Sequence, residues 1–179
     1  NKSDRNMNFN FYLGDWRINS SGAHVYSKPG TESHSCTRWI TFDKKFLEVD
    51  TNQSQIITLK IQIPDSPEAV EEMKWSMLFI EAVEEAKAPA PTKLMKSEII
   101  PLTRFGVHIY QTPPSITEKE MKLLSFTPIA RQKGTFRILT KNTGKVQLDC
   151  KSYMELSSVT DINKKYTVPS TQAPLFPDQ

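Results

Sequence analysis

The sequence contains few of the residues that build catalytic and metal sites. It has two cysteines, three histidines and six glycines in 179 residues. Cys36 and Cys150 lie far apart and form no Cys-x-x-Cys pair, which argues against a zinc site. Phosphate-binding glycine loops and a Gly-x-Ser-x-Gly nucleophile motif are also absent. We therefore expect no enzyme, no metal and no cofactor, and free thiols are favoured over a single disulfide.

Long apolar runs are absent as well. No run approaches the roughly 18 residues that a membrane-spanning helix needs, and no signal-peptide core is visible near the first residue. We therefore expect no membrane contact. The net charge of +3 permits contact with nucleic acid without requiring it. Two other polar features, His108 and the group Glu81, Glu84 and Glu85, are expected on a solvated surface rather than in catalysis.

Short segments of alternating apolar and polar residues occupy most of the chain. In Gln55–Ile63, the clearest, four apolar residues alternate with Thr58, Lys60 and Gln62. A hairpin turn is predicted at Lys141–Gly144, joining the strands before and after it. This pattern predicts an all-β antiparallel sandwich or barrel. The other predicted strands are Phe9–Ile18, Thr37–Phe42, Phe46–Val49, Arg104–Gln111, Thr135–Thr140 and Lys145–Leu156.

The segment Glu68–Glu85 fits two interpretations. Ser66 and Pro67 form a good helix start, and several apolar residues then follow at helical spacing. From Lys74, however, apolar and aromatic residues also alternate. The segment is therefore either a helical turn over Pro67–Met73 followed by a strand over Lys74–Val83, or one continuous helix. A loop is predicted at Ala86–Thr92.

Two pairs of segments resemble the jelly-roll strands of picorna-like virus capsid proteins. Gln55–Ile63 and Lys74–Val83 are similar to the paired central strands of that fold, particularly in the plant secovirus family. Gly134–Leu139 and Val146–Cys150 are similar to its closing hairpin. The size is similar to that of a small cheravirus coat protein. The resemblance implies a jelly-roll β-sandwich over residues 9–156, an N-terminal arm over 1–8 and a C-terminal tail over 157–179.

The resemblance also implies a function and a set of residues. The chain would be the coat protein of a non-enveloped icosahedral RNA virus, found in the virion and, during assembly, in the host cytoplasm. Its partners would be other capsid subunits and the genomic RNA. The absence of an initiator methionine and the final glutamine are typical of a segment cut from a polyprotein. Residues with expected roles are the processing ends Asn1 and Gln179, the RNA-facing Lys2 and Arg5, and the inter-subunit anchors Leu175 and Phe176.

Two alternatives stay open at the level of sequence. The segment Tyr12–Trp16 resembles the Gly-x-Trp start of lipocalin-like barrels, which would place Trp16, Trp39 and Trp75 around a ligand cavity. These rings would otherwise fill the core of a sandwich. A viral matrix or movement protein is the other alternative, because it would accommodate a helix after Pro67.

Overall fold

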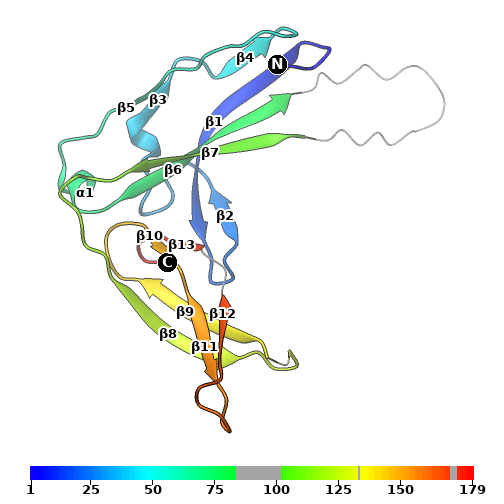
Figure 1. Ribbon diagram of the computed structural model, residues 1–179. Coiled ribbons are helices and arrows are strands. Elements are labelled where there is room, and N and C mark those ends of the chain that lie inside the picture. The colour runs from blue at the N-terminus through cyan, green and yellow to red at the C-terminus, as the bar shows by residue number, and fades with distance from the viewer. Residues whose placement is uncertain (84–101, 133, 170–172) are drawn as a thin grey trace. The chain divides into compact units, whose positions relative to one another are not determined.

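The computed structural model describes residues 1–83, 102–132, 134–169 and 173–179. The chain is all-β, its strand pairs are antiparallel, and the described helices are only one turn long (Figure 1). It divides into two compact units. Unit 1 comprises Asn1–Arg17, Val25–Asp65 and Lys74–Gln111, and unit 2 comprises Ile18–His24, Ser66–Met73 and Thr112–Gln179. The predicted single sandwich over residues 9–156 differs from this division.

The main sheet of unit 1 has five strands. Its order is β2-β1-β6-β7, and β4 also pairs with β1. The bounds are Met7–Ile18 for β1, His24–Ser27 for β2, Phe46–Val49 for β4, Lys74–Val83 for β6 and Arg104–Gln111 for β7. The central strand β6 is buried over most of its length, as expected for a strand with neighbours on both sides.

A smaller sheet in unit 1 pairs β3 (Ile40–Phe42) with β5 (Leu59–Ile61). It follows a 3₁₀ turn, η1 (Thr37–Trp39), that is attached to β6 through Cys36. The Cys36 backbone N–H donates to the Trp75 carbonyl at 3.3 Å and to Ser76 Oγ at 3.1 Å. These bonds fix the start of β3 beside the main sheet.

Asp15 organises the loop that leads into η1. Its side chain is 1% exposed. One carboxylate oxygen accepts the backbone N–H groups of Thr31 and Glu32, and the other accepts the Ser35 hydroxyl. A buried carboxylate is tolerated where hydrogen bonds replace its lost hydration. Asp15 therefore holds the loop against β1.

Unit 2 contains three two-stranded sheets and the turn of helix α1 (Pro67–Val70). Asn142, at the end of β9, is fully buried and donates through Nδ2 to the carbonyls of Val146 and Leu175. Its Oδ1 accepts the Gly144 N–H, so one side chain ties three segments together. The strand pairs are β8 (Met121–Pro128) with β9 (Phe136–Asn142), β10 (Leu148–Cys150) with β13 (Ala173–Leu175), and β11 (Tyr153–Ser157) with β12 (Lys165–Pro169).

Several predicted elements are confirmed. The strands Phe46–Val49 and Arg104–Gln111 have the predicted bounds. Glu68–Glu85 is not a continuous helix, since α1 ends at Val70 and β6 begins at Lys74. Both cysteines are free thiols. The loop predicted at Ala86–Thr92 lies outside the described residues.

Other predicted elements need correction. Gln55–Ile63 forms a strand only at Leu59–Ile61, and Thr37–Trp39 is a 3₁₀ turn. The hairpin predicted at Lys141–Gly144 is wrong, because β9 pairs with β8, a strand that the sequence did not predict. The predicted tail over 157–179 contains β12 and β13. The jelly-roll topology is not confirmed. No described helix has the length and apolarity to cross a membrane.

Candidate functional site: the edge strand β7

Strand β7 lies at the end of the main sheet of unit 1 (Figure 1). It pairs with β6 over its whole length, from Arg104 opposite Glu81 to Gln111 opposite Lys74. None of the strands that the structure describes pairs with its other side. An edge of this kind is a template for a strand from another chain, and natural proteins usually protect it with charges, proline or a covering segment.

One face of β7 carries apolar side chains that are open to solvent. Phe105, Val107 and Ile109 alternate along this face. Phe105 is 58% exposed and Val107 is 46% exposed. Because each of these side chains would lose water on contact with another protein, the face combines backbone pairing capacity with apolar anchors.

A polar cluster fastens the beginning of β7 to the sheet. Glu81 Oε2 accepts the Tyr12 hydroxyl at 2.8 Å and Arg104 Nε at 2.9 Å, and it lies 2.8 Å from a terminal Arg104 nitrogen. The Arg104 guanidinium also lies 5.5 Å from the centre of the Phe79 ring, which stacks on Tyr12. Arg104 therefore joins three strands at this end of the edge.

The charges of this cluster alter two pKa values. The hydrogen bond from Tyr12, followed by that from Arg104, lowers the pKa of the Glu81 carboxyl below its usual 4.5. Burial, followed by the hydrogen bond to Glu81, raises the pKa of the Tyr12 phenol. Both directions keep Glu81 charged and Tyr12 neutral near neutral pH.

Aromatic rings stack beneath the opposite face of β7. The exposed His108 lies on Trp16, with ring centres 4.6 Å apart, and Tyr110 donates to or accepts from His108 Nδ1 at 2.9 Å. Trp75 Nε1 donates to the Trp16 carbonyl, and His34 stacks on Trp75 at 4.5 Å. Trp16 and Trp75 are 1% and 2% exposed. Trp16 and Trp75 therefore belong to the core, as a sandwich would have them, while Trp39 is half-buried.

Gly106 allows β7 to lie close to its neighbour. A Cβ atom at this position would come within 2.5 Å of the sulfur of Met77, which is buried in β6. A glycine inside a strand often marks such a close approach. Strand β7 therefore packs closely against Met77 in the core, and Arg104, its first residue, fastens it to the sheet.

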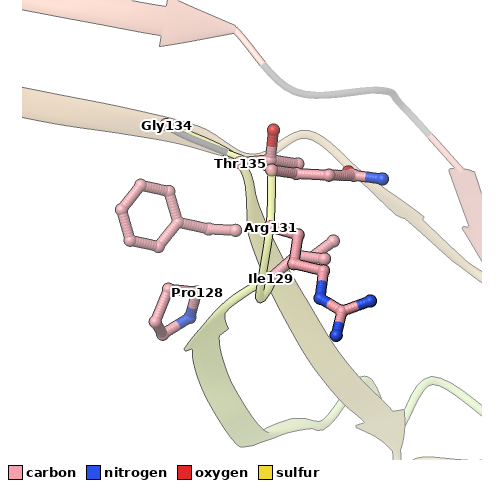
Figure 2. A pocket seen from close by; sticks show the side chains of 7 residues that line it. Pro128, Ile129, Arg131, Gly134 and Thr135 are labelled. Atoms are coloured by element: carbon pink, nitrogen blue, oxygen red, sulfur yellow. The ribbon is translucent and has the colours of Figure 1, made fainter.

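A shallow pocket at the β8–β9 turn of unit 2 is a weaker candidate site than the β7 edge. It encloses about 370 Å³. Figure 2 shows Pro128, Ile129 and Arg131 on one arm of the turn and Gly134 and Thr135 on the other. Among the described residues that line it, Arg131 is the one that carries a charge. The described residues contain no cluster of three or more His, Cys, Asp or Glu side chains that could hold a metal ion.

The six residues to which the sequence assigned roles fall into both units. In unit 1, Lys2 and Arg5 are exposed, and the amino group of Asn1 donates to the Gln53 carbonyl at 2.8 Å. In unit 2, Leu175 pairs with Leu148, and Phe176 is 1% exposed. Phe176 is thus buried in its own chain. Gln179 Oε1 accepts the Ile18 N–H at 2.9 Å.

Solved structures share this fold. No protein-family model matches the chain. No curated protein matches it either. One match is a structure of a chaperone–tip adhesin complex of CFA/I fimbriae biogenesis, with 14% sequence identity and a TM-score of 0.55. The alignment covers 99% of this chain and 72% of the solved chain. The class 5 fimbriae chaperone CfaA matches with the same coverage and identity and a TM-score of 0.52. The CsuC–CsuE chaperone–tip adhesion subunit complex of Acinetobacter baumannii matches with 9% identity and a TM-score of 0.49.

These likenesses correct the interpretation as a virus coat protein. The two neighbours with TM-scores above 0.5 are a fimbriae chaperone and a chaperone–tip adhesin complex, so the secovirus resemblance, the capsid function and the virion location are wrong. The expected partners, other capsid subunits and RNA, are wrong with them, and so are the ligand-barrel and matrix-protein alternatives. Alternating apolar strands are common to all antiparallel sheets that bury one face, which is why the pattern could not separate these proteins.

The sequence predicted β7 as a strand but gave it no function. Its alternating pattern, Phe105, Val107 and Ile109, was visible between Arg104 and the break at Pro113. Such a pattern tells which side chains share a face, but not whether the strand lies at an edge or whether that face is covered. The site is identified by the structure, in which β7 has β6 as its single partner among the described strands and Phe105 and Val107 are exposed.

Proposed function

We propose that this chain is a chaperone-like protein that binds a partner with an incomplete β-sheet by offering β7 as a pairing edge. The observation that carries the proposal is the edge itself, where β7 has one described strand neighbour and two strongly exposed apolar side chains, Phe105 and Val107. Backbone pairing along such an edge supplies affinity, and alternate side chains supply specificity. The proposed activity is binding, without catalysis.

The likeness to fimbrial chaperones supports the proposed class of partner. The two structures with TM-scores above 0.5 are described as a fimbriae chaperone and a chaperone–tip adhesin complex. We propose an immunoglobulin-like sandwich for the finer fold of unit 1 and a fimbrial subunit as the partner. The protein would then act in the bacterial periplasm, before the subunit is assembled.

A refolding experiment tests the proposal. A fimbrial subunit from the same organism is unfolded in urea and diluted into buffer with this protein, and the complex is measured by size-exclusion chromatography with light scattering. A 1:1 complex is expected. Phe105→Asp with Val107→Asp should weaken it about 100-fold or more, since each lost apolar anchor contributes about 1.5–3 kcal/mol.

The control is Phe46→Asp. Phe46 is 53% exposed on β4, away from the β7 edge, so this variant should bind as the wild type does. Circular dichroism establishes that the variants are folded. Wild-type affinity in the folded double variant, or the absence of a complex with wild-type protein, contradicts the proposal.

A further inference from the structure

A second apolar surface of unit 1 is a cleft between β1 and β3. It has a volume of about 510 Å³. Phe11 and Leu13 of β1 form one wall, and Ile40 and Phe42 of β3 form the other. A cleft of this size falls within the range of sites that bind small molecules or peptide side chains. It is distinct from the β7 edge and from the pocket of unit 2.

The rim of this cleft is positively charged. Arg38 and Lys45 line it, and none of its lining residues is Asp or Glu. Contacts with β1 and with the Gly30 turn place these two residues. The Lys45 carbonyl accepts the Phe11 N–H at 2.9 Å, and Arg38 Nε lies so near the turn that a Cβ atom on Gly30 would be 3.4 Å from it. The neighbouring carboxylate of Asp43 accepts the Thr58 N–H. The rim therefore favours an anionic ligand.

Apolar rows connect the cleft with the edge strand. In the register of the main sheet, Phe11 lies opposite Ile80, which lies opposite Phe105. Leu13 lies opposite Leu78 in the same way, and Leu78 lies opposite Val107. Side chains that are directly opposite in a sheet share a face. The apolar face that is exposed at β7 thus continues across β6 to the wall of the cleft.

We propose that this cleft binds an extended, acidic segment of the same partner that pairs with β7, with an apolar side chain between the walls and its carboxylates at Arg38 and Lys45. The inference rests on the proposed function for the identity of the partner. Continuity with the β7 face favours a protein segment as the occupant, and the two cations favour an acidic one. The cleft would select among partners, because a lysine-rich segment would meet charges of its own sign.

Fluorescence anisotropy with two labelled peptides tests this inference. The probes are the capped pentapeptides Asp-Phe-Asp-Phe-Asp and Lys-Phe-Lys-Phe-Lys. Wild-type protein should bind the acidic peptide at least about tenfold more tightly than the basic peptide, which corresponds to a difference of about 1.4 kcal/mol in binding free energy. Arg38→Glu with Lys45→Glu should abolish or reverse this preference. The control is Lys2→Glu with Lys60→Glu, which changes the net charge by the same amount at two exposed residues outside the cleft. This variant should keep the preference for the acidic peptide.

Two further measurements separate this inference from the proposed function. Phe42→Ala removes part of one wall and should weaken binding of the acidic peptide. Phe105→Asp with Val107→Asp should leave peptide binding unchanged, whatever its effect on the fimbrial subunit. Equal affinity of wild-type protein for both peptides, or an unchanged preference after charge reversal at Arg38 and Lys45, overturns the inference and leaves the role of β7 standing.

Discussion

Glu81 shows how a single carboxylate stabilises the edge strand. Its Oε2 atom receives hydrogen bonds from Tyr12 on β1 and Arg104 on β7, so it links the strands on either side of β6. The Tyr12 bond, and then the Arg104 bond, lowers its folded-state pKa below 4.5. The unfolded chain therefore takes up a proton at higher pH than the folded chain does. The stabilisation is present above pH 4.5 and is lost as the pH falls through the lowered folded-state pKa.

We predict that Glu81→Gln destabilises the protein at pH 7 but has little effect near pH 3. At low pH the wild-type carboxyl is protonated and no longer attracts Arg104 as an anion. Urea unfolding midpoints between pH 3 and pH 7 measure the difference. Glu71→Gln, which neutralises an exposed glutamate outside the cluster, is the control. A difference between wild type and Glu81→Gln that stays constant with pH contradicts the prediction.

The role of Glu81 could not be predicted from the sequence. Glu81, Glu84 and Glu85 were interpreted together as a solvated face, and Glu84 and Glu85 lie outside the described residues. The partners of Glu81 are 69 residues before it and 23 residues after it in the chain. They come together only through the register of β1, β6 and β7. Sequence spacing gives no information on that register.

At the scale of elements, local patterns predicted the strands better than their pairing. Arg104–Gln111 was predicted to the residue because an alternating run ends at a polar residue and two prolines. Thr135–Thr140 was also predicted, with Lys145–Leu156 as its partner. The structure pairs it with Met121–Pro128, a strand interrupted by a register shift between Leu123 and Ser125. That irregularity breaks the period of two, and so the strand could not be recognised.

Asn142 explains why the chain does not form a hairpin directly after β9. Its buried side chain bonds Val146, Leu175 and Gly144, and this holds the following segment in a loop beside β13. We predict that Asn142→Ala lowers the free energy of unfolding by about 2–4 kcal/mol, because it leaves buried backbone groups unpaired. Thermal unfolding measures the loss, with the exposed Asn163→Ala as the control. A loss as small as that of Asn163→Ala contradicts this role.

At the scale of the whole molecule, the amino-acid composition argued against several kinds of functional site but did not indicate which class of protein this is. Scarce cysteine, histidine and glycine argued against several kinds of site, and the alternating strands correctly indicated an all-β antiparallel protein. Those same features are shared by coat proteins, ligand-binding barrels and chaperones, so the choice among them depended on a resemblance of pattern. The likeness to solved fimbrial chaperones contradicts the first two classes, and the open apolar face of β7 supports the binding function that we propose, because a fold alone does not determine a function.

The open β7 edge also predicts how the protein behaves on its own. An exposed apolar edge strand pairs readily with another copy, so we predict self-association that increases with protein concentration. Val107→Lys should reduce it, because natural edges use lysine to prevent such pairing. Sedimentation velocity over a hundredfold concentration range measures the effect. Leu123→Lys is the matched control, since Leu123 is 63% exposed on β8 in unit 2. If Leu123→Lys abolishes association and Val107→Lys does not, contact through the β8–β9 hairpin explains the association, and the β7 edge does not.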